Sequence, residues 1–501
     1  MRKPTRPLQC SMLALTLAFA IAAAHATTII DNANGYTLNA KGDVVQFASL
    51  AFDDAGRILA VGTPTDVAAK VPQATHVDMA GRTVLPGLID AHGHVFGLGQ
   101  MLTQLDLSAT TSLPQALAAI GDYARANAQA AWVRGRGWNQ ENWKLGRFPT
   151  AQELDGVVAD RPVWLERVDG HAGWANGRAL ATMASVGLTG AHDAGIGVGE
   201  DRLYRDYADH GKLTARIYAM IGGTGADFDQ LAKNGPLNSY GHDMYALRAV
   251  KLYADGALGS RGAALLAPYT DDPHSHGLLF HSNAEIDAMI AKAMKRGYQV
   301  NVHAIGDAGN RQILDTFAKE IPLHHAQALR HRIEHAQVVT PADIPRFKSI
   351  GIIPSMQPTH ATSDKNMAEQ RIGPERMKGA YAWRTFLAQG SRIACGSDFP
   401  VEAPNPFFGI HAAVTRQDAG GNPIAGWYPE QEMSLKEAFR CFTLDAAYAG
   451  HQENTLGSLE MGKYADFIVV DRDLFRISPY DIHKTVVLET WVGGHRVYRK
   501  P

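Results

Sequence analysis

Short apolar runs alternate with amphipathic stretches through the second half of the chain. Residues 249–253 and 298–303 have the apolar character of buried strands, whereas residues 284–296 carry apolar positions at helical spacing. A second helix is expected through Ile313 and Phe317. Further short strands are expected at residues 332–334, 351–355 and 392–395. Buried strands that alternate with helices are typical of parallel β/α units, so the pattern predicts an α/β fold.

The two ends of the chain have a different texture. Residues 44–50 and 57–61 are short β-type runs separated by a turn, and similar runs return at residues 465–470 and 485–498. Strand-rich segments at both ends predict one small β-sandwich assembled from the two termini. A length of 501 residues accommodates a (β/α)8 TIM-type barrel together with such a module.

The first 26 residues have the features of an export signal. Arg2, Lys3 and Arg6 give a positive start, an apolar run follows over residues 12–24, and Ala24-His25-Ala26 supplies small residues for cleavage. The run is short for a membrane anchor, the alternative, because a spanning helix needs about 20 apolar residues. We therefore expect an exported protein, periplasmic or secreted, that keeps no stable membrane anchor.

These patterns give an expected organisation for the whole chain. It comprises a signal peptide at 1–26, a composite β-sandwich from 27–84 plus 450–501, and a barrel at 85–449. Residues from about 105 to 245 are rich in Gly, Trp and Asn and fit the β/α alternation less well. We expect them to form an insertion after the first barrel strand, contributing to the wall of the active site.

Charge and cysteine content narrow the classes of partner. The formal net charge is −2 and no stretch concentrates Lys and Arg, so nothing attracts nucleic acid or an anionic membrane. A small-molecule substrate is expected, and a homo-oligomer is left open. After signal removal Cys395 and Cys441 remain, both in apolar sequence. We expect two buried free thiols, with a single bridge between them as the alternative.

The strongest local signal for chemistry is a pair of histidines at the end of an apolar strand. His92 and His94 end the segment that begins at Val84, and their i, i+2 spacing sends both side chains to one face of a strand. Two neutral imidazoles on one face form half of a site for a divalent metal ion. Alone, such a pair is as often incidental as it is a ligand pair.

Four further residues fall at the ends of predicted strands and could complete the site: Lys251, His303, His335 and Asp398. The carboxyl ends of parallel barrel strands converge on one rim, where catalytic centres of such folds lie. Each residue also has a structural alternative. Lys251 could extend its amine to solvent, the histidines could be satisfied core residues, and Asp398 could cap a turn. Five strand ends offering metal ligands together favour the metal site.

The order HxH, Lys, His, His, Asp resembles the amidohydrolase superfamily. The segments around these residues are similar to its YtcJ-like branch, the amidohydrolase 3 group, at residues 251–261, 302–307, 332–335, 396–400 and 457–466. The resemblance implies one metal held by His92, His94 and Asp398, and a second held by His303 and His335. Lys251 would bridge the two as a carbamate, because an ammonium has no lone pair to offer. A one-metal site stays open.

The resemblance also implies a reaction. Zinc is the expected metal, although imidazole and carboxylate ligands also admit Mn²⁺, Fe²⁺ or Co²⁺. Metal-activated hydroxide would cleave the C–N bond of an amide, formamide or cyclic amide, with Asp398 as general base. Tentative substrate contacts are His171, which could also act in catalysis, and Trp138 and Arg261. Each could instead serve the scaffold: His171 by ordering the insertion, Trp138 by packing, and Arg261 by pairing with a carboxylate.

Two other functions compete with hydrolysis of an amide. A deaminase uses HxH, His and Asp around one metal ion, but the proton-shuttling Glu that such enzymes place near the third histidine does not adjoin His303. Lys251 also favours the bridged arrangement. A non-catalytic binding protein on the same barrel would be expected to lack one or more ligands, and none is missing.

Overall fold

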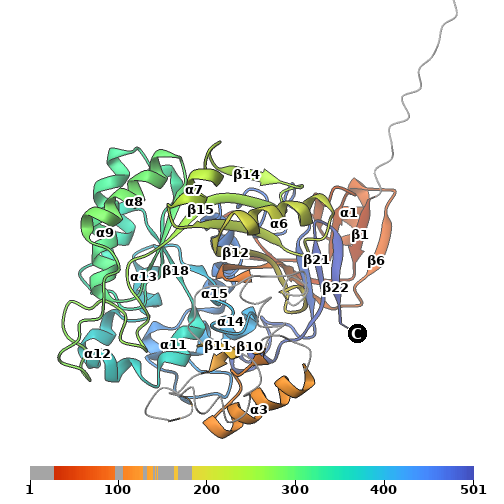
Figure 1. The fold of residues 1–501 in the computed structure, drawn as a ribbon. Helices are drawn as coiled ribbons and strands as arrows, with labels where there is room; N and C mark the ends of the chain where they lie inside the picture. The colour runs from red at the N-terminus through yellow and green to blue at the C-terminus, as the bar shows by residue number, and fades with distance from the viewer. Residues whose placement is uncertain are drawn as a thin grey trace, which may run out of the picture.

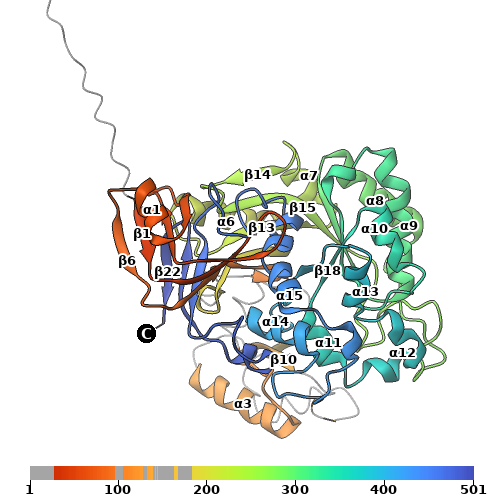
Figure 2. The ribbon, with the colours of Figure 1, turned by 180° about the vertical axis from the view of Figure 1, so that it is seen from behind.

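The computed structural model describes residues 27–95, 105–127, 133–138, 142, 144, 163–167 and 183–500. A barrel of parallel strands surrounded by helices occupies the centre, and strands from both chain ends gather on one side of it (Figure 1 and Figure 2). The predicted signal peptide at residues 1–26 lies outside the described residues. Within the described part of the chain, no helix combines the length and the apolarity needed to cross a bilayer.

Eight parallel strands form the barrel. Their order is β8, β12, β13, β15, β16, β17, β18 and β19, and the antiparallel β14 extends from β15. The bounds are β8 Leu88–Gly93, β12 Leu188–Ile196, β13 Arg216–Gly222, β14 Leu237–Tyr240, β15 Tyr245–Tyr253, β16 Gln299–Ala304, β17 Arg332–His335, β18 Ile353–Met356 and β19 Ala394–Cys395. The strands expected at residues 249–253, 298–303, 332–334, 351–355 and 392–395 each overlap one of these, which confirms the predicted β/α alternation.

The barrel closes just beyond the end of β19. The backbone N–H of Asp398 donates to the carbonyl oxygen of His92 at 2.7 Å, and the N–H of His94 donates to the carbonyl of Phe399 at 2.6 Å. The Asp90 carboxylate strengthens this contact by accepting from the His92 N–H and from both the N–H and the hydroxyl of Ser397. These bonds place the first and last barrel segments side by side.

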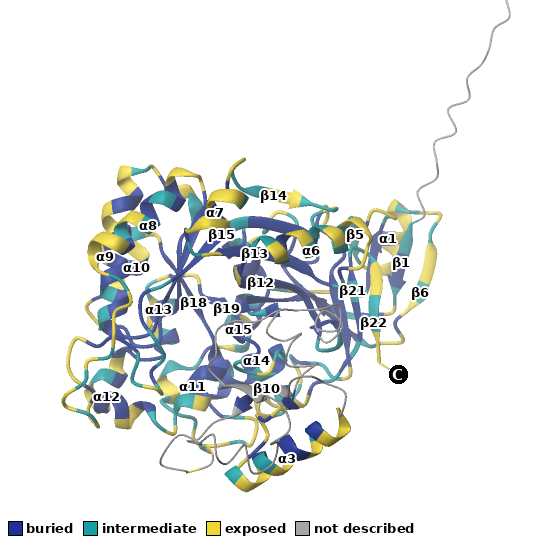
Figure 3. Ribbon diagram, viewed as in Figure 1, coloured by how far each residue is buried: buried dark blue, intermediate teal, exposed yellow. Residues whose placement is uncertain are grey.

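Helices cover the outside of the barrel. In α8, Ser282 caps the helix by accepting from the Glu285 N–H while the Glu285 carboxylate accepts from the Ser282 N–H. Figure 3 shows that α8 and α9 expose their outer faces, whereas β12, β13 and β15 are largely buried. The helix bounds here are α6 Val198–Asp209, α7 Ala226–Leu231, α8 Asn283–Lys295, α9 Asp307–Leu323, α10 Ile344–Ile350, α11 Pro358–Asp364, α12 Ala368–Arg376, α13 Trp383–Ala388, α14 Pro406–Thr415, α15 Leu435–Cys441 and α16 Leu444–Ala449, with short 3₁₀ turns at Gln327–Leu329, Met377–Gly379, Pro429–Gln431 and Pro479–Lys484.

The two chain ends build a β-sandwich, as predicted. One sheet has the order β5, β4, β1, β6, and the other has the order β22, β21, β20, β7, β2, β3. The second sheet joins both ends, because β20 from the C-terminal segment pairs with β7 from the N-terminal segment. The bounds are β1 Thr28–Asp31, β2 Asn34–Leu38, β3 Val44–Phe47, β4 Ser49–Phe52, β5 Ile58–Gly62, α1 Pro64–Lys70, β6 Thr75–Asp78, β7 Thr83–Pro86, β20 Phe467–Val470, β21 Val487–Val492 and β22 His495–Arg499.

The insertion is shorter than predicted. Residues 188–196 and 216–222, placed in the insertion over about 105–245, are the second and third barrel strands. In β12 the side chains of His192 and Asp193 are buried inside the molecule, so this strand lacks the apolar pattern that marks the others. The insertion itself contains α3 Leu113–Ala126 and a parallel sheet of β9 Leu105–Asp106, β10 Val133–Trp138 and β11 Val163–Arg167.

The prediction of two free thiols is wrong. Cys395, at the end of β19, and Cys441, at the end of α15, form a disulfide with Cα atoms 5.2 Å apart. Both side chains are buried, as their apolar sequence context indicated. Local sequence predicts burial but carries no information on whether the two thiols meet in space.

A buried ion pair connects the barrel to the sandwich. Arg216 at the start of β13 donates from Nε and an η nitrogen to both oxygens of Asp466, at 2.7 and 2.9 Å. The Tyr464 ring lies 3.9 Å from the Arg216 guanidinium carbon. Asp466 also accepts from the Gly493 N–H at 2.7 Å. Both charged side chains are almost fully buried, so each depends on the other for compensation.

We expect Arg216→Ala to lower the free energy of unfolding by about 3–5 kcal/mol, because it leaves the Asp466 carboxylate buried without its counter-charge. Denaturant titration monitored by tryptophan fluorescence measures the change. Lys378→Ala is the control, since it removes one partner of an ion pair that is mostly exposed and should change stability by less than about 1 kcal/mol. Equal stability of the two variants would contradict a structural role for the buried pair.

Candidate metal centre

His92, His94 and Asp398 meet at the rim where the barrel closes. The first two lie at the end of β8, and Asp398 lies three residues beyond β19. The Asp398 Oδ1 atom is 3.3 Å from His92 Nε2 and 3.0 Å from His94 Nε2. Asp398 has a φ of 59°, a left-handed conformation that is uncommon outside glycine and is concentrated at functional sites. The predicted convergence of strand ends therefore brings these three side chains together.

Glu334 fixes the orientation of the His92 ring. Its Oε2 atom lies 2.6 Å from His92 Nδ1, and both side chains are fully buried. Burial alone would raise the pKa of the Glu334 carboxyl, but the neighbouring His92 and Arg332 hold that pKa below its ordinary value. The ionised Glu334 accepts a hydrogen bond from Nδ1–H, which leaves the lone pair of His92 Nε2 directed at the rim.

His335 has the same arrangement around a different acceptor. Its Nδ1 lies 2.8 Å from the Gln357 Oε1 atom, an acceptor, so the proton is on Nδ1. Among the described residues, nothing hydrogen-bonds to the buried Nε2 of His335. Burial, and the neighbouring His303, hold the pKa of His335 well below its ordinary value, so the ring is neutral.

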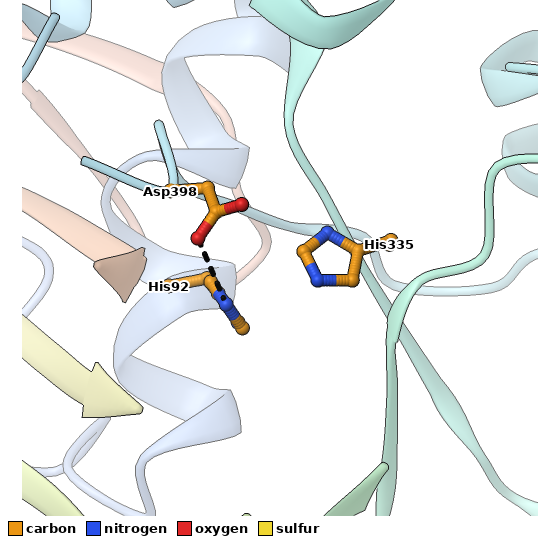
Figure 4. Close-up of side chains that lie close together, drawn as sticks. All are labelled: His92, His335 and Asp398. Carbon is orange, nitrogen blue, oxygen red and sulfur yellow. Dashed lines mark ion pairs between the residues drawn. The ribbon is translucent and has the colours of Figure 1, made fainter. Parts of the chain in front are cut away.

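Two imidazole nitrogens and one carboxylate oxygen thus face a common point. Ligand atoms of His92, His335 and Asp398 all lie within 4.8 Å of one another. Figure 4 shows the His92–Asp398 contact with the His335 ring beside it. Neutral imidazole and ionised carboxylate are the ligands that Zn²⁺ and similar divalent ions take in proteins. The orphaned Nε2 of His335 and the fixed orientation of both rings fit a metal ion.

Lys251 and His303 join the same cluster. The Lys251 Nζ atom, fully buried on β15, lies 3.1 Å from His92 Nε2. Burial lowers the pKa of this amine to about 8, against the opposing effect of Glu334 and Asp398. His303, on β16, has its ring centroid 4.6 Å from that of His335. All six residues predicted as ligands therefore lie at one rim of the barrel.

Asp398 is ionised in this environment. Burial would raise the pKa of its carboxyl, but the adjacent His92, His94 and His335 rings hold that pKa well below its ordinary range. The ionised carboxylates of Glu334 and Asp398 are thus stabilised by the histidine rings beside them.

Three residues beside the cluster were not identified from the sequence. Gln357 and His360 follow β18, the seventh barrel strand, and Gln337 follows β17. The Gln337 Nε2 atom lies 3.0 Å from His360 Nδ1, and His360 Nε2 lies 3.6 Å from the Asp398 Oδ2 atom. The rule that strand ends converge on one rim would have pointed to Gln357, because it directly follows an apolar strand.

Of the three substrate-contact residues predicted from the sequence, the structure describes the side chain of Arg261. His171 and the side chain of Trp138 lie outside the described residues. Arg261, with a φ of 57°, makes a two-point ion pair with Asp271 at 2.9 and 3.2 Å. This is the scaffold contact that the sequence left open as the alternative for Arg261, and its contact with a substrate stays a prediction.

Comparison with known proteins decides the family. A model of the amidohydrolase family matches residues 75–198 and 177–498, which together span most of the chain. The chain belongs to the amidohydrolase family. The matched residues include the whole barrel and all six residues of the cluster, so the resemblance seen in the sequence motifs is confirmed.

Individual relatives cover most of this amidohydrolase. It is 30% identical over 494 residues to YtcJ of Bacillus subtilis, named as an amidohydrolase, with 86% of this chain and 91% of that protein covered. It is 26% identical over 549 residues to N-substituted formamide deformylase of Arthrobacter pascens, with 94% and 98% covered. An uncharacterised metal-dependent hydrolase of Pyrococcus furiosus has a solved structure that superposes with a TM-score of 0.72, at 25% identity, over 89% of this chain and 99% of its own.

We expect Glu334→Ala to weaken binding of a divalent ion by about 10–100-fold, because the variant loses the acceptor that orients His92. Competition between the amidohydrolase and a chelating dye for zinc measures the affinity without reference to any substrate. Glu375→Ala removes a carboxylate that is 84% exposed and remote from the cluster, and it should leave the affinity unchanged. Wild-type affinity in Glu334→Ala would show that Glu334 does not support a metal site.

Proposed function

We propose that this amidohydrolase is an exported, metal-dependent enzyme that hydrolyses the C–N bond of an amide, formamide or cyclic amide. The observation that carries the proposal is the approach of ligand atoms from His92, His335 and Asp398 to within 4.8 Å, at the rim of a barrel whose family consists of amidohydrolases. The similarity to a formamide deformylase over nearly the full length supports a small amide as the substrate class.

The proposed ligands divide into two groups. His92, His94 and Asp398 would hold one ion, and His303 and His335 a second, with Lys251 between them. A divalent ion supplies Lewis-acid chemistry, polarising an oxygen and lowering the pKa of water bound to it to about 7. Zinc is proposed as the metal, because imidazole and carboxylate ligands suit it. The contacts of Glu334 with His92 and of Gln357 with His335 support this assignment, because both keep Nε2 available.

Asp398 is proposed as the general base. Its carboxylate is ionised and lies within 3.0 to 3.3 Å of two proposed ligand nitrogens, which supports this role. It would accept the proton of that water as the carbonyl carbon is attacked, and it would then deliver the proton to the leaving nitrogen. His171, Trp138 and Arg261 are proposed as substrate contacts on the grounds given by the sequence.

Lys251 is proposed to react with carbon dioxide. A neutral amine adds to the carbon of CO₂ and releases one proton. The product is a carbamate, whose two oxygens can serve as ligands. Complete burial of Lys251 and the 3.1 Å approach of Nζ to His92 Nε2 support this step, because burial favours the neutral amine and the proposed ligands surround it. The carbamate would bridge the two groups of ligands.

Export is proposed from the character of residues 1–26. The pairing of Cys395 with Cys441 supports it, because disulfides form and persist mainly in oxidising compartments. The substrate would then be met outside the cytoplasm.

We expect His92→Ala to lose both bound metal and turnover, since one proposed ligand disappears. Metal analysis of the purified protein and a screen of N-acyl amino acids, formamides and cyclic amides measure the two effects. His495→Ala, on the exposed part of β22, is the matched control and should keep both. Full activity of His92→Ala against a substrate of the wild type would refute the proposed centre.

A separate prediction concerns Lys251. The wild type supplied with isotopically labelled carbon dioxide should show a carbamate carbon signal that is missing from Lys251→Ala. That variant should lose activity and regain part of it with a short carboxylic acid, which replaces the bridging oxygens. Lys378→Ala should behave as the wild type. A wild type without the carbamate signal, together with no recovery in Lys251→Ala, would show that Lys251 stays an amine.

A further inference from the structure

His360 is a buried histidine that the ligand set does not include. It lies on α11, directly after the seventh barrel strand, with 8% of its surface exposed. Its ring stacks on that of His335, with centroids 5.7 Å apart and planes inclined by 24°. It therefore borders the metal centre on the side of His335.

The hydrogen bond to Gln337 determines which nitrogen of His360 carries the proton. The Gln337 side-chain nitrogen can only donate, and it lies 3.0 Å from His360 Nδ1. Nδ1 must therefore accept, which puts the ring proton of neutral His360 on Nε2. The residue thus presents an N–H donor at Nε2.

That donor faces one particular oxygen. His360 Nε2 lies 3.6 Å from Asp398 Oδ2, whereas His92 and His94 approach Asp398 Oδ1. Oδ1 thus faces the two histidines of β8, and Oδ2 faces His360. Among the described residues, nothing hydrogen-bonds to His360 Nε2.

We propose that His360, held by Gln337, is a positioning residue that fixes the rotation of the Asp398 carboxylate. Its Nε2–H attracts Oδ2 and thereby keeps Oδ1 directed at His92 and His94. The carboxylate then presents one orientation to the reacting water throughout the reaction. The proposal rests on the proposed function of Asp398 as general base and adds the element that orients it.

A pair of substitutions separates this role from packing. Glutamine at position 360 keeps an N–H donor near the place of Nε2, whereas leucine has a similar size and no donor; both lose the acceptor for Gln337. With the metal-loaded full-length enzyme, we expect His360→Leu to lower kcat by about tenfold or more, with a smaller change in KM. His360→Gln should recover most of kcat, and both variants should keep the metal content of the wild type.

Other results would overturn the proposal. Equal losses of kcat in the two variants would mean that the Nε2–H donor of His360 is not the feature that matters, and wild-type kcat in His360→Leu would mean that His360 has no role. Loss of metal in both variants would make His360 a ligand. Crystal structures of the metal-loaded variants provide a readout without a substrate: Asp398 should turn in His360→Leu and keep its rotation in His360→Gln. A wild type that hydrolyses no C–N compound would refute the proposed function, and the two crystal structures would still test the role of His360.

Discussion

Closure of the barrel between its first and last strands holds the proposed metal centre together. The Asp90 carboxylate accepts from the His92 N–H on one side, and from the N–H and hydroxyl of Ser397 on the other. The backbone bond from Asp398 to His92, 2.7 Å long, completes this contact. Asp398 therefore reaches His92 and His94 because the two ends of the barrel order are bonded to each other at this point. Without that contact, the proposed ligands from the first and eighth strands would belong to separate edges of an open sheet.

Hydrogen bonds to the outer ring nitrogens decide what the inner ones can do. Glu334 accepts from His92 and Gln357 accepts from His335, and in each case Nε2 is left with its lone pair directed at the centre. Gln337 does the opposite to His360, since it donates to Nδ1 and leaves a proton on Nε2. Of the three histidine rings at this rim, His92 and His335 thus present a lone pair at Nε2, whereas His360 presents an N–H donor there. The difference follows from the chemical identity of a single partner in each case.

The sequence predicts much of the fold, and most of the residues that meet at the barrel rim, because the relevant patterns are local. Apolar strands that end in His or Asp remain visible as a local pattern, so residues such as His303 and Asp398 could be found from their own neighbourhoods. The second barrel strand was missed because His192 and Asp193 turn polar side chains into the interior. Partners distant in sequence were also missed: Gln337 and His360 lie 23 residues apart, and Cys395 and Cys441 lie 46 apart. Only the folded chain shows that they meet.

Three buried carboxylates at the rim differ in charge because their partners differ. Asp90 is bonded mainly to neutral donors, and burial raises its pKa to about 7. Glu334 and Asp398 are equally buried, but adjacent imidazoles hold the pKa of each below its ordinary value. Glu334 contacts Nδ1 of His92, and Asp398 contacts Nε2 of the same ring. Negative charge is therefore concentrated where the proposed ligands converge, and a divalent cation bound there would compensate it, while Asp90 can serve the closure of the barrel without adding a full charge.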